Sequence, residues 1–120
     1  MKTFRELVVW QKAMSFVAEI YKASGSVPEE EMYGLSGQIR RCAVSIPSNI
    51  ADGFGRGTTA NYIRFLLISA GSLFELQTQM EIARNLNFIG SADFQTLHDA
   101  TREVERLLTA LIRKLQSKTL

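Results

Sequence analysis

The sequence predicts an all-α protein, an antiparallel up-down four-helix bundle, and three observations support this fold class. Apolar residues recur at steps of three and four along four segments, the spacing of a stripe on one helix face. Helix start and stop signals separate these segments, and no segment has a convincing strand pattern. Short connections between helices of similar length require each helix to run antiparallel to the next.

The first helix is predicted over residues 4–23. Thr3 and Glu6 have the spacing of a capping box, which satisfies free N–H groups at a helix start, and Gly25 suits a helix stop. The core stripe of this helix is expected to contain Leu7, Trp10, Met14, Val17 and Tyr21.

The second helix is predicted over residues 28–53, because Ser26 and Pro28 form a start signal. Pro47 removes one backbone N–H and crowds the preceding turn, so we expect a proline kink within this helix. Asn49 is polar within the core stripe, which predicts that it sets the register or bonds a neighbouring helix. The expected core stripe is Leu35, Ile39, Cys42, Ile46, Asn49 and Gly53.

The third and fourth helices are predicted over residues 59–86 and 92–117. The glycine-rich segment before Thr58 is interpreted as a turn, because a phosphate-binding loop needs a preceding strand and a Gly-Lys-Ser/Thr sequence. The expected core stripe of the third helix is Ile63, Leu66, Ala70, Leu73, Gln77 and Met80. That of the fourth helix is Phe94, Leu97, Thr101, Val104, Leu108, Leu111 and Leu115.

The first and third helices each carry a second apolar stripe beside the expected core stripe. One interpretation is a subunit interface, most simply with another copy of the chain, which predicts a homo-oligomer. The other interpretation is one wide buried arc within a monomer. The candidate interface residues are Val9, Ala13, Phe16, Ile20, Phe65 and Leu76.

Length and composition favour a single domain over residues 1–120. The formal net charge of +2 is too small an excess to identify a nucleic-acid binder by itself. Cys42 is the single cysteine, which excludes an intrachain disulfide and a cysteine-based zinc site. No signal peptide and no run of about 18 apolar residues is present, so we expect a cytoplasmic protein without a membrane partner.

Basic residues nevertheless gather at helical spacing, above all on the fourth helix. Arginine presents a fork of donors that suits phosphate oxygens, which makes these side chains candidate nucleic-acid contacts. The alternative is a solvated face, because Asp99, Glu103 and Glu105 interleave on the same helix. The candidate contacts are Arg40, Arg41, Arg56, Arg102, Arg106, Arg113, Lys114 and Lys118.

No group of residues predicts catalysis, a metal site or a cofactor, so we do not expect an enzyme. His98 is the single histidine, which excludes a multi-histidine metal cage and the paired Glu-x-x-His motifs of a di-iron bundle. A histidine phosphotransfer domain is a further alternative. It is disfavoured because Asp99–Arg102 lacks the lysine and glycine that such domains carry after the histidine.

Several motifs, in order along essentially the whole chain, resemble those of one bacterial family of four-helix bundle proteins. This family was first associated with intervening sequences in 23S ribosomal RNA genes. Asp52 stands where the family commonly has glutamate. The motifs are Val9-Trp10-Gln11, Tyr33-Gly34-Leu35, Gln38-Ile39-Arg40-Arg41, Ser45-Ile46-Pro47-Ser48-Asn49-Ile50-Ala51-Asp52-Gly53, Gly55-Arg56 and Gly71-Ser72-Leu73-Phe74-Glu75-Leu76.

The resemblance implies a left-handed bundle that assembles into a ring-like homopentamer. It also implies a relationship to the accessory variability determinant of diversity-generating retroelements, which binds a reverse transcriptase and nucleic acid. Two functions therefore remain open: an oligomeric scaffold that contacts nucleic acid or a reverse-transcriptase-like protein, and a protein-only interaction module.

Overall fold

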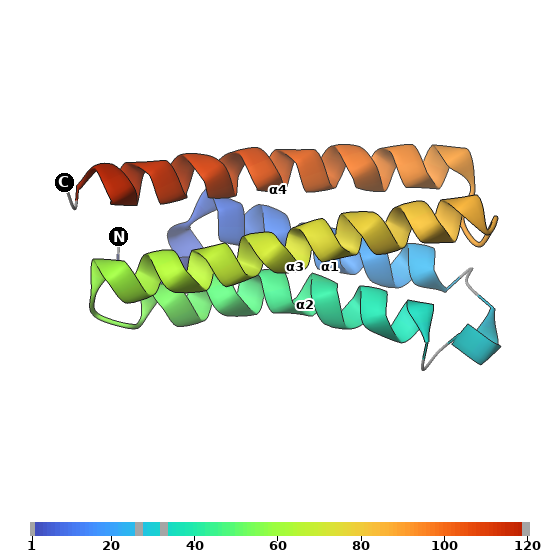
Figure 1. Cartoon of the computed structure of the whole chain (residues 1–120), viewed down its shortest axis with the longest axis horizontal. Coiled ribbons are helices and arrows are strands. Elements are labelled where there is room, and N and C mark those ends of the chain that lie inside the picture. The colour runs from blue at the N-terminus through green and yellow to red at the C-terminus, as the bar shows by residue number, and fades with distance from the viewer. Residues whose placement is uncertain (1, 26–27, 32–33, 119–120) are drawn as a thin grey trace.

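The computed structural model describes residues 2–25, 28–31 and 34–118. Within these residues the chain forms helices and no strand, which confirms the all-α class. Figure 1 shows four long helices side by side, each running opposite to the one before it. The elements are η1 (Phe4–Glu6), α1 (Val8–Ser24), η2 (Glu29–Glu31), α2 (Leu35–Phe54), α3 (Thr59–Asn85) and α4 (Ser91–Ser117).

The start of the first helix differs from the prediction. Thr3 and Glu6 do form the capping box, but they cap the short 3-10 helix η1 rather than a long α-helix. Leu7 then adopts an extended conformation, with φ −73° and ψ 123°, and α1 begins at Val8. This interruption between η1 and α1 places the Leu7 side chain in the core, where it is buried. The free energy gained from this burial offsets the loss of a continuous helix.

The start of the second helix was also predicted wrongly. The start signal at Ser26 lies outside the described residues, and Glu29–Glu31 form only the 3-10 turn η2. Gly34 has φ −101° and ψ −117°, which is not helical, so α2 begins at Leu35. In contrast, the observed bounds of α3 and α4 lie within one residue of those predicted.

Helix α2 continues through Pro47, and the side chains of the two residues after it donate to carbonyls in the turn before it. Ser48 Oγ donates to the Val44 carbonyl at 2.8 Å. Asn49 Nδ2 donates to the Ser45 carbonyl at 2.8 Å, so Asn49 bonds its own helix and not a neighbouring one as predicted. The proline kink and the left-handed twist of the bundle stay predictions.

Two serine contacts connect α2 to α3. Ser69, fully buried on α3, donates from Oγ to the Ile46 carbonyl at 2.9 Å. The hydroxyls of Ser45 and Ser72 lie 2.9 Å apart. Close approach of the two helices also depends on Gly53, because a Cβ there would lie 2.7 Å from Cβ of Phe65.

The core draws on all four helices, and its largest side chains include Phe16, Ile46, Leu66 and Leu108. The predicted stripe of α4 is confirmed through Leu108, and Ile112 continues it. Helix α3 buries residues of both of its apolar stripes, because it packs against α2 on one side and α4 on the other.

The predicted core stripe of α1 is only partly confirmed: Leu7 is buried, and Trp10 and Val17 pack against the core. Val9, Ala13, Phe16 and Ile20, predicted as interface residues, are buried inside this chain's own core. Two of the predicted core residues of this helix, Met14 and Tyr21, are exposed.

One of the two predicted interface residues on α3, Leu76, also faces inward. Leu76 is fully buried, and Phe65 is half-buried beneath the Arg56 guanidinium at 4.5 Å. The physical reason is that α1 and α3 each contact two neighbours, so each needs a wide buried arc.

Candidate interaction surfaces

Helix α3 turns an apolar stripe outward, which we call the α3 ridge. Leu67, Phe74 and Ile82 share one side of the helix, and each exposes between 43% and 51% of its surface. Gly71 lies between Leu67 and Phe74, and a Cβ there would meet no atom within 4 Å. An exposed apolar stripe of this kind is typical of a protein-protein contact.

A second apolar surface is concave and lies between α1 and α2; we call it the α1/α2 groove. Its volume is about 350 Å³. At one end Phe4 packs edge-on against Trp10, with ring centroids 5.2 Å apart. Its lining residues are Phe4, Trp10, Met14, Val17, Val44, Pro47, Ser48 and Ala51.

The ridge and the groove lie on different sides of the bundle. Within the described residues, α1 packs against α2 and α4, and α3 packs against the same two helices, so α1 and α3 are diagonal to one another. One of the two helices that line the groove, α1, therefore does not contact α3, which carries the ridge. The sequence predicted a partner surface on these two helices, but all of the residues it named except Phe65 are buried within this chain.

Charge is unevenly distributed along the bundle. Both chain ends and the turn between α2 and α3 lie at the same end, on the left of Figure 1, which we call the basic end. The acidic residues of this end are Glu6, Asp52 and, next to Arg106, Glu105. Its basic residues are Lys2, Arg5, Arg56, Arg64, Arg106, Arg113, Lys114 and Lys118, all of them exposed.

The opposite end of the bundle is acidic. It contains the η2 turn, the connection between α3 and α4, and the first turns of α4. Its acidic residues include Glu19, Glu29, Glu30, Glu81, Asp93 and Asp99, which outnumber its basic residues Lys22, Arg40, Arg41 and Arg84. The small formal net charge therefore conceals a separation of charge along the long axis, which extends 46 Å.

The structure separates the predicted nucleic-acid residues into two groups. Arg40 and Arg41 lie in the second turn of α2, at the acidic end, away from the basic residues of α4. Arg40 is also engaged locally, because its Nε donates to Ser24 Oγ at 2.8 Å and its guanidinium stacks 4.8 Å from the Tyr21 ring. The single basic face that the sequence suggested is thus not one surface.

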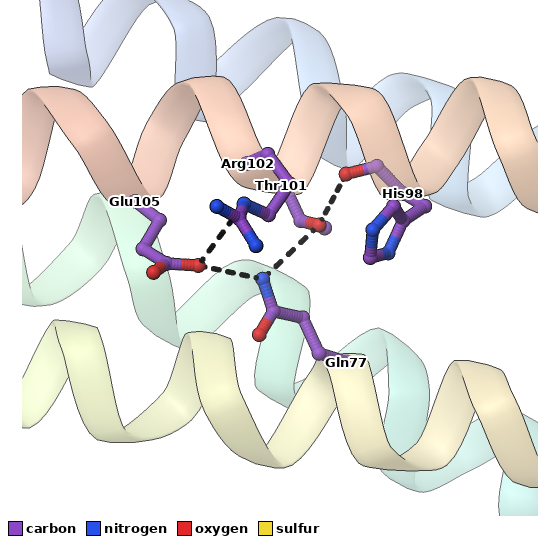
Figure 2. A network of polar contacts seen from close by, with 5 residues as sticks. All are labelled: Gln77, His98, Thr101, Arg102 and Glu105. Atoms are coloured by element: carbon purple, nitrogen blue, oxygen red, sulfur yellow. Dashed lines mark hydrogen bonds and ion pairs between the residues drawn. The ribbon is translucent and has the colours of Figure 1, made fainter.

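Arg56 and Arg102 belong to local contacts as well. Arg56 pairs with Asp52 at 3.0 Å, and Arg102 Nε lies 3.9 Å from Glu105 Oε1. Figure 2 shows why Glu105 is held in place: Gln77 reaches from α3 and donates to Glu105 at 3.2 Å and to Thr101 Oγ1 at 3.2 Å.

The remaining predicted contacts on α4 lie at the basic end. Arg106, Arg113, Lys114 and Lys118 are exposed and form no ion pair with any other described residue. Sequence reasoning missed Lys2, Arg5 and Arg64, because only the fold brings the start of α1 and of α3 beside the end of α4.

The described residues contain no group of three or more histidine, cysteine, aspartate or glutamate side chains placed to hold a metal ion. His98 is half-buried and stacks on Phe94, with ring centroids 5.6 Å apart. None of the helices, as far as the structure describes them, combines the length and hydropathy that a membrane span requires.

Comparison with known proteins identifies the family that has this architecture. The family model described as 23S rRNA-intervening sequence protein matches residues 5–110, which include all four helices nearly to the end of α4. The chain belongs to the 23S rRNA-intervening sequence protein family. This confirms the resemblance seen in the sequence motifs.

A solved member of the S23 ribosomal protein family, from Bacteroides thetaiotaomicron and described as a protein with unknown function, has a similar fold. It superposes with a TM-score of 0.82 at 23% sequence identity, over 88% of this chain and 96% of the Bacteroides chain. No curated protein matches the sequence. The likeness to the Bacteroides protein shows that the two chains share the same fold.

Proposed function

We propose that this chain is a non-enzymatic scaffold that assembles into a ring of identical copies and holds nucleic acid at its basic end. The observation that carries the proposal is the pair of unlike apolar surfaces, a ridge and a groove, on one chain. Neither surface contains a nucleophile with a base or a metal-binding group among the described residues.

The shapes of the two surfaces favour contact between copies. A ridge on one copy and a groove on the next form a heterologous interface, and repetition of such an interface closes a ring when the rotation fits. Five copies is the number that the family resemblance implies. The ridge exposes Phe74 and Leu67, and the groove is lined by Met14 and Val44, so apolar area is available on both sides of the contact.

The charge distribution supports the choice of nucleic acid as the partner. Arg113, Lys114 and Lys118 lie near the end of α4, and no acidic residue follows Glu105 in the sequence. A ring repeats this basic end in every copy, and several weak phosphate contacts act together when they are linked in one particle.

Light scattering during size-exclusion chromatography tests the assembly. We expect the unmodified chain to elute as a closed oligomer and Phe74→Glu to elute as a smaller species, because a carboxylate would be buried without a partner in the interface. Leu86→Glu is the matched control, since Leu86 is equally exposed but follows the end of α3 outside the ridge. A monomeric unmodified chain would overturn the ring.

Fluorescence anisotropy with a labelled DNA duplex at several salt concentrations tests the nucleic-acid partner. We expect binding that weakens steeply with salt, and a double variant R113Q/K114Q whose salt slope falls by about 0.9 for each lost phosphate contact. The control K22Q/R41Q removes the same charge from the acidic end and should bind as the unmodified chain does. A closed oligomer with no salt-sensitive binding would favour a protein-only interaction module.

A further inference from the structure

A polar groove between α2 and α3 is not used by the proposed function. Its volume is about 250 Å³, and none of its lining residues belongs to the α3 ridge or to the α1/α2 groove. Arg41 and Cys42 line it from α2, and Glu75 and Gln79 line it from α3. A space of this volume fits a metabolite of a few heavy atoms rather than a drug-sized ligand.

Gln79, one of the lining residues of this polar groove, has a buried hydrogen-bond acceptor without a partner. Gln79 is 5% exposed, and its Oε1 is the only buried side-chain oxygen or nitrogen of the described residues that has no hydrogen-bond partner. Gln79 Nε2 donates to Gln38 Oε1 at 3.5 Å, which leaves the oxygen of the same amide for another donor. Buried polar atoms are usually satisfied, so this oxygen indicates a position for an N–H donor of a ligand.

Two opposite charges face the same space without pairing. Arg41 and Glu75 stand on opposite walls of the groove, and neither forms an ion pair with another described residue. Both act on the Cys42 thiol: burial raises the pKa of Cys42, and the Glu75 carboxylate raises it further through its charge and a hydrogen bond. A hydrogen bond with the Gln79 side chain and the Arg41 guanidinium lower the pKa. A ligand that carries one charge of each sign would satisfy both walls.

We propose that this groove binds a small zwitterion of the α-amino acid class. Its ammonium group donates to Gln79 Oε1 and to the Glu75 carboxylate, and its carboxylate accepts from the Arg41 guanidinium. Arginine suits this role because its fork of donors matches the two oxygens of a carboxylate.

Titration of the ¹⁵N-labelled full-length chain with glycine, L-alanine and L-serine tests the proposal. We expect saturable shifts of the Gln79 side-chain amide and of the Cys42 backbone amide. Glu75→Gln and Arg41→Gln should each weaken binding by about tenfold, the loss expected from one charge-assisted hydrogen bond. Both positions are exposed, so these variants should keep the fold, and Glu81→Gln is the matched control on the same helix.

A second measurement uses the only cysteine of the chain as a reporter. Cys42 lines the groove, so saturating amino acid should slow its alkylation by iodoacetamide, whereas the N-acetyl and the amide derivatives should not. The proposal is overturned if none of the three amino acids gives a saturable shift. It is overturned equally if the derivatives bind as well as the zwitterions, or if Glu75→Gln and Arg41→Gln bind with unchanged affinity.

Discussion

Helices α3 and α4 have the same length, 27 residues each, but they differ in what they turn outward. The outer face of α4 is charged, whereas α3 is apolar on its outer face as well as its inner faces. The charged outer face of α4 is well solvated by water, whereas exposure of the apolar Leu67 and Phe74 of α3 to water is unfavourable. This difference is the reason why the proposed contact with a second copy is placed on α3 and not on α4.

The largest expected effect concerns the outer faces. Phe74→Glu destroys the ridge and leaves the groove intact, and Met14→Glu does the reverse. Each variant alone should be monomeric, but an equimolar mixture should form a heterodimer through the one intact ridge and the one intact groove. Thr109→Glu on the outer face of α4 should leave the unmodified assembly unchanged, which light scattering would show.

An interface of like with like gives a different result in the same experiment. If ridge contacted ridge, the mixture of Phe74→Glu with Met14→Glu would form no heterodimer, and Met14→Glu alone would still associate. That outcome would contradict the head-to-tail ring.

On the inner faces the two helices should be equivalent. Leu66 on α3 and Leu108 on α4 are both buried to within 1% exposure. Replacement of either by alanine should lower the free energy of unfolding by about 2–5 kcal/mol, because methyl groups are lost and a cavity forms. Urea unfolding at one protein concentration measures both, and a much smaller loss for Leu108→Ala would show that α4 packs loosely.

The contact between α2 and α3 should be more sensitive to added volume than the exposed side of α3. Gly53→Ala places a Cβ 2.7 Å from Cβ of Phe65, a clash that costs about 1–3 kcal/mol. Gly71→Ala meets no atom, so it should stabilise α3 by up to about 1 kcal/mol through helix propensity. Both are measured by urea unfolding in the Phe74→Glu variant, so that assembly does not enter, and equal signs would contradict the prediction.

The smallest effects are expected for the polar contacts of α3 with its two neighbours. Ser69→Ala removes a fully buried donor to the Ile46 carbonyl and should cost about 1 kcal/mol. Gln77→Ala removes the contacts with Thr101 and Glu105 shown in Figure 2, which are partly solvated, so it should cost less. Thermal unfolding compares the two, and a larger loss for Gln77→Ala would make the polar network of Figure 2 the stronger contact.

The sequence was sufficient to predict α4 but not α1. Helix α4 has one apolar stripe against a charged face, so Leu97 and Val104 could only point inward. Helix α1 has two apolar stripes, and spacing alone did not distinguish the buried Phe16 from the exposed Met14. The choice depends on where α2 and α4 lie, which is information from the tertiary structure.

The candidate surfaces, like the helices, could be predicted from the sequence only in part. The basic character near Arg113 and Lys114 was evident from the sequence. The antiparallel arrangement of the helices adds Arg5 and Arg64 to the basic end. The same arrangement places Arg40 at the opposite, acidic end. The groove around Gln79 joins residues from two helices, so no local motif indicated it.

The bond from Ser69 to the Ile46 carbonyl also limits how α3 is able to slide along α2. A slip of one helical turn is a translation of about 5.4 Å, and it would carry the hydroxyl away from its acceptor. A purely apolar interface resists such a slip only through the shapes of its side chains, whereas a slip at this interface also loses the interhelical hydrogen bond of the buried hydroxyl. Ser69 therefore contributes little to the stability of the α2–α3 pair, but it helps to fix the register of α3 along α2.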